Sequence, residues 1–215
     1  MNKTRSIEDS TLIYAMKKIK IYYGMSGAFK GSTIEALKKK DSGVMVMNSS
    51  IKNWKYYENG VFNGKIEYND LTYGILHLVR LREFIDSNYQ KGVDLIIERG
   101  ITDPLFYYSQ SNVAPGLMIE EAVRQEQSLL LPDFFQIERI LLVQNDKDFI
   151  KNYILQDPYR KQTFKNDPEY YLGLQEDYIN FTTRYNGIDQ IVRVDDAKDY
   201  IENQLGETFK QEKSC

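Results

Sequence analysis

The sequence predicts an α/β fold in which a parallel five-stranded sheet is flanked by helices. Five short apolar segments have the near-continuous hydrophobicity of strands that are covered on both faces. These segments span residues 19–23, 44–47, 93–97, 140–144 and 190–194. Segments with helical spacing alternate with them, at residues 33–40, 71–89, 119–130, 146–155, 169–185 and 197–205. Strands that alternate with helices form parallel sheets, whose ligands bind beyond the carboxyl ends of the strands.

The length and composition favour a single globular domain. The chain has 215 residues, of which 42% are hydrophobic and 27% are charged, and this fits one domain that spans residues 1–215. No apolar run approaches the roughly 20 residues that cross a membrane. The N-terminal segment lacks the apolar core of a secretion signal. We therefore expect a cytoplasmic protein that does not enter the membrane.

The residue counts exclude several kinds of site. Cys215 is the single cysteine and His77 the single histidine, so an internal disulfide, a cysteine-rich zinc site and a site with several imidazoles are excluded. A net charge of −3 provides no general attraction to nucleic acid, so a small-molecule partner is favoured. The chain has 17 tyrosines, which we interpret first as packing residues and second as surfaces for base stacking.

A glycine-rich loop follows the first predicted strand and leads into a helix. Residues 24–33 read Gly-Met-Ser-Gly-Ala-Phe-Lys-Gly-Ser-Thr. Glycines let backbone N–H groups turn toward phosphate oxygens, a lysine adds a positive charge, and the helix N-terminus adds its dipole. We interpret the segment as a loop that binds the phosphates of a nucleotide. The predicted contacts are Gly24, Ser26, Gly27, Ala28, Phe29, Lys30, Gly31, Ser32 and Thr33.

The loop departs at two positions from the P-loop pattern G-x-x-x-x-G-K-[ST]. Phe29 occupies the position of the second glycine, and Gly31 that of the Ser or Thr that binds Mg²⁺. Ser32 or Thr33 would then supply the metal-binding hydroxyl, and Ser32 is our candidate. We expect Lys30 to be an exposed loop lysine whose charge faces the β- and γ-phosphates. The alternative is an ordinary βα turn with a lysine in the first helical turn.

The third predicted strand ends in a charged pair, Glu98 and Arg99. Charges at the end of a core strand are costly unless they have partners or a ligand. Residues 98–108, Glu-Arg-Gly-Ile-Thr-Asp-Pro-Leu-Phe-Tyr-Tyr, resemble the Asp-Arg-x-x-x-Ser-x-x-x-Tyr segment of thymidylate kinases and the Glu-Arg-Ser segment of deoxynucleoside kinases. Asp103 and Pro104 depart from both patterns. A pair that binds only itself or its neighbours is the alternative.

The resemblance to these kinase families implies a P-loop NTPase fold, with ATP as phosphoryl donor and Mg²⁺ as cofactor. It implies that Arg99 clamps the acceptor or the transferring phosphate. It also implies that Glu98 binds the metal or the acceptor, and that Tyr107 contacts the substrate. Together with Lys30, these residues form the expected catalytic and binding set at the ends of the strands.

The same resemblance extends to a helix and a lid. Thymidylate kinases carry an arginine for the monophosphate on the helix before the Asp-Arg strand, and either Arg80 or Arg82 matches it. A basic lid that closes over ATP corresponds to residues 156–168, where Arg160 is the candidate to face the transferring phosphoryl group. For all three arginines a solvated surface position is the alternative. The helix after the lid, at residues 171–178, we interpret as packing.

The second predicted strand leads into a segment that resembles deoxynucleoside kinases in part. Trp54 and Asn59-Gly60 match the later part of their Glu-Pro-x-x-x-Trp and Asn-Gly pattern, so Trp54 is a candidate substrate contact, with packing as the alternative. Ser49 stands where that family has a glutamate, the general base toward a sugar hydroxyl. A serine cannot fill that role near neutral pH. Its presence favours an acceptor that is already an anionic phosphate.

The order of these motifs along the chain favours ATP-dependent phosphoryl transfer to a deoxynucleoside monophosphate, as in thymidylate kinases. Segments set by different parts of a fold that agree are stronger evidence than any one of them. The alternatives are a deoxynucleoside 5′-kinase, a polynucleotide or modified-base DNA kinase, and a nucleotide-binding regulatory protein without catalysis. A homodimer is compatible with the sequence, and the divergence of the motifs would suit a phage enzyme.

Overall fold

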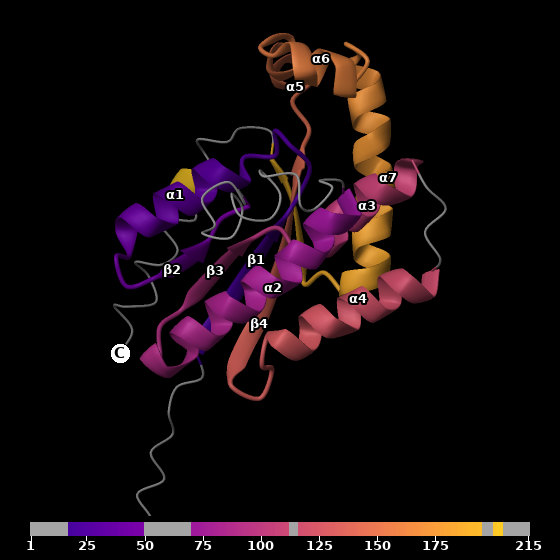
Figure 1. Cartoon of the computed structure of the whole chain (residues 1–215). Helices are drawn as coiled ribbons and strands as arrows, with labels where there is room; N and C mark the ends of the chain where they lie inside the picture. Colours follow the sequence, from indigo (N-terminus) through magenta and orange to yellow (C-terminus); the bar gives the residue numbers. More distant parts are fainter. Residues whose placement is uncertain (1–16, 50–69, 112–115, 195–199, 204–215) are drawn as a thin grey trace, which may run out of the picture.

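The protein contains a five-stranded sheet in which every strand is parallel to its neighbours (Figure 1). The computed structural model describes residues 17–49, 70–111, 116–194 and 200–203. The strands are β1 (Lys17–Tyr23), β2 (Met45–Met47), β3 (Leu95–Glu98), β4 (Phe135–Gln144) and β5 (Gln190–Val194). Their order in the sheet is β2-β3-β1-β4-β5. The predicted parallel α/β sheet is therefore confirmed.

Two strands begin earlier than their hydrophobicity indicates. β1 begins at Lys17, and β4 begins at Phe135, five residues before the predicted start. The early parts of both strands pair with each other, from Lys17 opposite Phe135 onward. They carry half-exposed charges, including Lys20 and Glu138, which form an ion pair at 3.4 Å. Hydrophobicity predicts only the part of a strand that is covered on both faces.

The helices lie between the strands as predicted, with two additions. They are α1 (Lys30–Lys40), α2 (Asp70–Asn88), the 3-10 turn η3 (Tyr89–Lys91), α3 (Thr102–Ser111), α4 (Gly116–Leu129), α5 (Lys147–Leu155), α6 (Pro158–Thr163) and α7 (Pro168–Asn186). α3 and α6 were not predicted, because each is short and begins at or near a proline that reads as a break in the helical pattern. A proline is tolerated in the first turn of a helix, where its missing N–H has no intrahelical partner. Residues 200–203 of the predicted last helix are helical.

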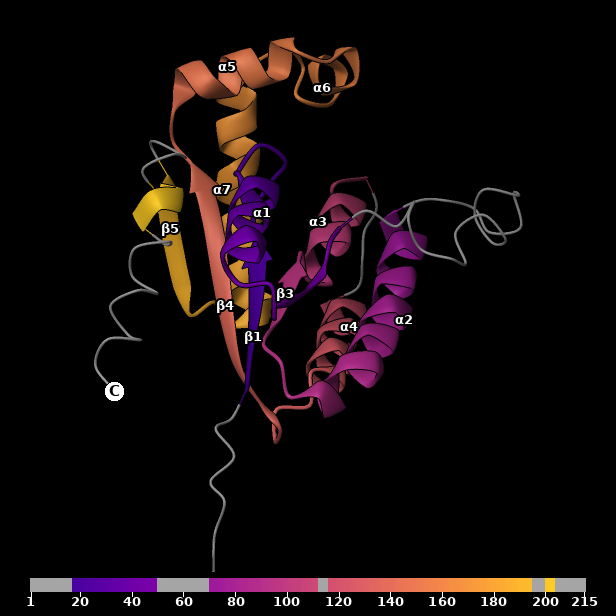
Figure 2. The same cartoon turned by 90° about the vertical axis from the view of Figure 1, so that its left-hand side faces the viewer.

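Alternate residues of the strands face opposite sides of the sheet. Ile19 and Ile21 of β1 lie in a core cluster with residues of α2, α3 and α7. Tyr22 points to the other face, where Ala28 and Ile34 cover the sheet. Figures 1 and 2 show α5 and α6 beyond the carboxyl ends of the strands, next to the start of α1. Within the described ranges no helix is long and apolar enough to span a bilayer.

Candidate active site

The loop between β1 and α1 wraps around the side chain of Lys30. This side chain is only 4% exposed, so the expectation of an exposed lysine was wrong. Its Nζ donates to the carbonyl oxygens of Gly24, at 2.5 Å, and Met25, at 2.9 Å. Gly24 has a φ of +143°, and a Cβ there would lie 2.6 Å from the carbonyl oxygen of Leu142, so no other residue fits.

The surroundings of Lys30 favour an anionic ligand. Burial lowers the pKa of Lys30 to about 7, and the nearby Arg99 acts in the same direction, whereas Asp103 and Glu98 oppose it. A buried cation that lacks full compensation gains from a negative charge brought next to it. Lys30 lines a cavity of about 390 Å³ together with the loop, Glu98, Arg99 and Tyr153. This cavity meets the N-terminus of α1, whose N–H groups and dipole favour phosphate.

Phe29, which replaces the second glycine of the motif, has the backbone conformation of a glycine. Its φ of 57° and ψ of 13° are left-handed, and it is the N-cap of α1 without a side-chain capping bond. The left-handed conformation costs an ordinary residue about 1–2 kcal/mol. The Phe29 ring lies 4.6 Å, centroid to centroid, from the ring of Phe149 on α5. This contact offsets the cost and joins the loop to α5.

The two residues predicted to bind a metal, Ser32 and Glu98, both line the first cavity. Ser32 is exposed and lines the cavity with Glu98. Thr33 is buried, and its hydroxyl donates to the carbonyl oxygen of Phe29 at 3.0 Å, so its hydroxyl hydrogen is already used within the helix. A Cβ at Gly31 would lie 4.0 Å from Glu98 Oε1. The motif position that lacks its hydroxyl is therefore next to the Glu98 carboxylate.

Glu98 and Ser32 suit Mg²⁺ as partial ligands. Mg²⁺ takes oxygen ligands and usually keeps several waters, with one or two carboxylates and the substrate phosphates completing its shell. Glu98 Oε2 accepts a bond from the Ser49 N–H at 2.9 Å, which fixes the carboxylate. The described part of the chain contains no group of three or more His, Cys, Asp or Glu side chains that could hold an ion by themselves. The donor set thus fits an ion that is shared with a phosphate ligand.

Arg99 adopts a left-handed conformation at the turn after β3, with a φ of 73°. Its Nε lies 3.6 Å from Oδ2 of Asp103 in the first turn of α3. Gly100, which stands at the serine of the Glu-Arg-Ser pattern, has no room for a side chain. A Cβ there would lie 2.4 Å from the Tyr23 ring.

Three tyrosine hydroxyls form hydrogen bonds to the loop between β1 and α1. Tyr178 on α7 accepts from the Gly24 N–H at 3.1 Å, and Tyr171 on the same helix donates to the carbonyl oxygen of Ser26 at 2.8 Å. Tyr153 on α5 shares a 2.5 Å hydrogen bond with Ser26 Oγ. The sequence alone favours packing as the role of these tyrosines. A seven-residue spacing, two turns along one helix face, was the available signal that Tyr171 and Tyr178 act together.

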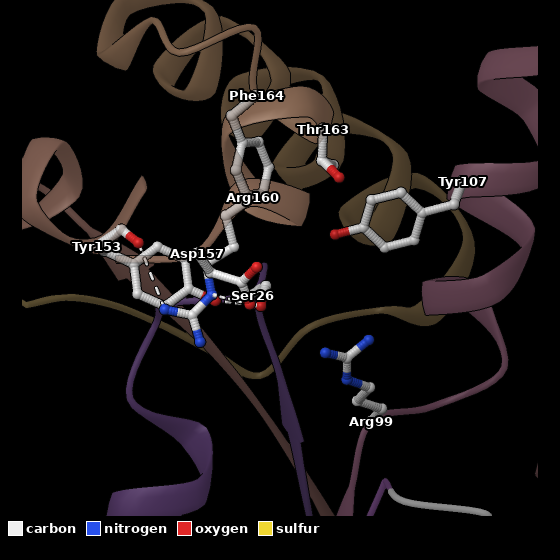
Figure 3. A pocket seen from close by; sticks show the side chains of 8 residues that line it. All are labelled: Ser26, Arg99, Tyr107, Tyr153, Asp157, Arg160, Thr163 and Phe164. Atoms are coloured by element: carbon white, nitrogen blue, oxygen red, sulfur yellow. Dashed lines mark hydrogen bonds and ion pairs between the residues drawn. The ribbon is translucent and has the colours of Figure 1, made fainter. Parts of the chain in front are cut away.

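A second cavity of about 340 Å³ opens between the loop and the predicted lid (Figure 3). It is lined by Ser26, Arg99, Tyr107, Tyr153, Asp157, Arg160, Thr163 and Phe164. Figure 3 shows Arg99 and Arg160 on different sides of it, with the Tyr107 hydroxyl pointing inward. Two guanidinium groups around one space suit phosphate oxygens, which match their planar donors.

Solved structures with a similar fold are nucleotide kinases. The chain is similar to thymidylate kinase from Ehrlichia chaffeensis, with a TM-score of 0.54, 13% identity, and coverage of 91% of this chain and 100% of that one. It is also similar to thymidylate kinase from Candida albicans, with a TM-score of 0.55, 14% identity, and coverage of 92% of this chain and 93% of that one. A third similar structure is deoxyadenosine kinase from M. mycoides, with a TM-score of 0.55, 16% identity, and coverage of 89% of this chain and 99% of that one. The fold is that of the P-loop kinases.

The likeness to P-loop kinases lies in the fold rather than in the sequence. No family model matches this sequence. No curated protein matches it either. Identities of 13–16% establish a shared architecture and leave the substrate open.

Within the P-loop kinase fold, the structure separates the two arginines of α2. Arg80 is 9% exposed, and its Nη2 donates to the carbonyl oxygen of Asn48, just beyond β2, at 2.9 Å. The Arg82 side chain is 60% exposed and pairs with Asp86 at 2.6 Å. The structure therefore brings Arg80 to the carboxyl edge of the sheet. It places Arg82 on the outer face of α2, so Arg82 does not line the site as predicted.

The other predicted residues fall into two groups. Residues 26–32 of the loop, Glu98, Arg99, Tyr107 and Arg160 line the two cavities. Gly24 is not among the lining residues, and its carbonyl oxygen accepts a bond from Lys30. Thr33 is turned into the protein and away from the first cavity, so it is a neighbour of the site and not part of its surface. Trp54 lies outside the described residues.

Proposed function

We propose that this protein is an ATP-dependent nucleotide kinase that phosphorylates a deoxynucleoside monophosphate. One observation carries the proposal: Arg99 and Arg160 flank a cavity that adjoins the loop around Lys30. Three cations thus gather at one edge of a P-loop kinase fold. Phosphoryl transfer depends mainly on positioning and on neutralising phosphate charge, which is what such a cluster supplies.

In this proposal each part of the site has a separate task. The loop N–H groups and the Lys30 ammonium would bind the donor phosphates, because residues 26–32, with Lys30 among them, line the first cavity. Glu98 and Ser32 would hold Mg²⁺, which neutralises phosphate charge when it is bound. Arg99 and Arg160 would bind the transferring group from two sides and stabilise the charge that develops on it.

The acceptor is proposed to carry a phosphate because of Ser49 and Arg80. Ser49, at the position of the general base in deoxynucleoside kinases, uses its backbone N–H to bind Glu98. Arg80 brings a guanidinium to the end of β2, on the same side of the sheet. A guanidinium suits a monophosphate better than it suits a sugar hydroxyl. The likeness to two thymidylate kinases agrees with this choice.

A deoxynucleoside 5′-kinase is the second candidate, and Glu98 favours it. Its Oε2 lies 2.9 Å from the Ser49 nitrogen, so a carboxylate does reach the neighbourhood of the missing base. A carboxylate near a sugar hydroxyl serves as a general base. The likeness to a deoxyadenosine kinase is of the same strength as that to the thymidylate kinases.

The deciding experiment compares acceptors. Deoxynucleoside monophosphates, the matching deoxynucleosides and an oligonucleotide are each incubated with ATP and Mg²⁺, and ADP release is measured. We expect the monophosphate to have the higher kcat/KM. A higher value for the deoxynucleoside or the oligonucleotide would replace the proposed acceptor. Lys30→Met, which removes the charge and keeps the length of the side chain, is the control. Wild-type ADP release no faster than that of Lys30→Met would indicate a nucleotide-binding protein without catalysis.

A further inference from the structure

Two buried hydrogen bonds and one ion pair connect the phosphate loop to Arg99 through two residues that the proposed mechanism does not use. The Tyr178 hydroxyl accepts from the Gly24 N–H and donates to Asp103 Oδ1. The other carboxylate oxygen, Oδ2, faces Arg99 Nε at 3.6 Å. Asp103 and Tyr178 are each 1% exposed. The chain therefore runs through the interior, from the entrance of the loop to the turn after β3.

A buried carboxylate at this place needs a cationic partner. A charge removed from water is costly unless it is paired. Burial raises the pKa of Asp103, and Arg99 and Lys30 oppose that rise. The same carboxylate also acts on the buried Lys30, so it lies within electrostatic reach of both Lys30 and Arg99. Asp103 is thus placed to act as their shared counter-ion.

The geometry at Arg99 separates two sides of its guanidinium. Nε, on the inner side, faces Asp103 and has no hydrogen-bond partner among the described residues. The two terminal nitrogens point into the second cavity (Figure 3). The backbone of Arg99 is in the left-handed region, which an arginine adopts only when its surroundings impose it. A counter-ion behind Nε holds the side chain and leaves the phosphate-binding side open.

We propose that Asp103 and Tyr178 are positioning residues for phosphoryl transfer: Asp103 orients Arg99 from behind, and Tyr178 fixes Asp103 to the entrance of the phosphate loop. This proposal rests on the kinase function proposed above. Neither residue touches the nucleotide. Both act on the orientation of Arg99, and orientation matters most when charge develops on the transferring group.

The proposal predicts a separation of turnover from binding. Without the Asp103 charge, less negative charge stands behind Arg99. Asp103 raises the pKa of Lys30, so binding of ATP is not weakened at a pH well below 7, where Lys30 keeps its proton without that support. The guanidinium loses its fixed direction, so kcat falls. A residue that only stabilises the fold would not produce this combination.

The test uses three variants and one matched control. Asp103→Asn keeps the shape and removes the charge, whereas Tyr178→Phe removes one hydroxyl. The control is Thr102→Val, because Thr102 Oγ1 accepts a 2.5 Å bond from Asn186 on α7. That bond joins α3 to α7, as the bond between Tyr178 and Asp103 does, without contact to Arg99 or the loop. The third variant is Asp103→Asn combined with Arg99→Gln, and Arg99→Gln alone is measured as its reference.

We expect Asp103→Asn to lower kcat by about tenfold or more, with no rise in the dissociation constant of ATP by calorimetry at a pH well below 7. Tyr178→Phe should lower kcat in the same way by about threefold or more, and it carries the test if Asp103→Asn does not fold. Thr102→Val should lower the melting temperature and keep the wild-type kcat. Wild-type kcat in both Asp103→Asn and Tyr178→Phe, or an equal loss in Thr102→Val, would overturn the proposal.

A readout without turnover separates this proposal from the proposed function. Breaking a buried ion pair at one partner is more destabilising than removing both charges. Asp103→Asn with Arg99→Gln should therefore melt at a higher temperature than Asp103→Asn alone. A wild-type protein that transfers no phosphate refutes the kinase function and leaves this comparison intact. A double variant that melts at the temperature expected from adding the two single losses refutes the pairing itself.

Discussion

The guanidinium carbon of Arg160 lies 4.0 Å from the centre of the Tyr153 ring, and Arg160 Nη1 donates to the Tyr153 carbonyl oxygen at 3.3 Å. Arg160 belongs to the predicted lid, while the Tyr153 hydroxyl binds Ser26 in the phosphate loop. Tyr153 therefore joins the lid to the loop through its ring on one side and its hydroxyl on the other. Its ring also stacks on Phe149, which contacts Phe29.

Replacement of Tyr153 tests this connection. Tyr153→Leu removes the ring under Arg160, and a cation–π contact contributes about 0.5–2 kcal/mol. We expect kcat/KM for ATP to fall by about tenfold, which corresponds to about 1.4 kcal/mol. Tyr153→Phe is the matched control, because it keeps the ring and loses only the bond to Ser26. It should lose less than about threefold in steady-state kinetics. Equal losses in the two variants would assign the effect to the hydroxyl.

Substitutions of Ser32 and Thr33 test which hydroxyl contributes to Mg²⁺ binding. We expect Ser32→Ala to raise the Mg²⁺ concentration for half-maximal activity by about threefold or more, since it removes a hydroxyl from a residue that lines the first cavity with Glu98. Thr33→Ala should leave this concentration unchanged, because its hydroxyl donates to Phe29. The measurement is a Mg²⁺ titration of ADP release at fixed ATP. If the Mg²⁺ concentration for half-maximal activity rises in Thr33→Ala and stays unchanged in Ser32→Ala, the metal-binding hydroxyl is that of Thr33.

The arginines of α2 provide a comparison on one helix. Arg80→Lys keeps the charge and loses the planar fork, so we expect kcat/KM for the deoxynucleoside monophosphate to fall by about tenfold. Arg82→Lys should match the wild type, since Arg82 pairs with Asp86 on the surface. Melting temperatures are measured alongside. If Arg80→Lys lowers the melting temperature and leaves kcat/KM unchanged, the bond to Asn48 is its only role.

The conformation of Phe29 predicts an unusual order of stabilities. Phe29→Ala loses the ring contact with Phe149 and keeps a left-handed backbone that suits alanine poorly. Phe29→Gly loses the same contact and has no such penalty. We therefore expect the glycine variant to exceed the alanine variant by about 1 kcal/mol in the free energy of unfolding. Urea denaturation of the two proteins measures the difference. A more stable alanine variant would show that residue 29 is not left-handed in solution.

The sequence by itself predicted the architecture and the place of the site. The buried parts of five strands appear as apolar runs, because strands covered on both faces need apolar side chains throughout. The glycine-rich loop and the Glu98-Arg99 pair follow two of these runs. Parallel strands place such positions at one edge of the sheet, so their proximity could be predicted before the structure was known.

Local signals were weaker where a proline or a charge interrupted the pattern. Pro104 and Pro158 read as breaks, yet each lies in the first turn of a helix. On α2, the helical periodicity distinguishes Arg80 from Arg82. Arg80 shares a face with the buried Leu76 and with Phe84, whereas Arg82 shares a face with Val79 and Asp86. The assignment of Arg80 to the interior was therefore available from the sequence.

Only the tertiary structure decided which polar groups meet. Tyr178 and Gly24 are 154 residues apart, and Tyr178 and Asp103 are 75 apart. The choice between packing and hydrogen bonding for a tyrosine depends on what its hydroxyl faces at the far end of the ring. No pattern within one helix contains that information, because the partner is supplied by a different helix or loop. The periodicity of a segment determines which face is buried, and the packing of segments determines what that face touches.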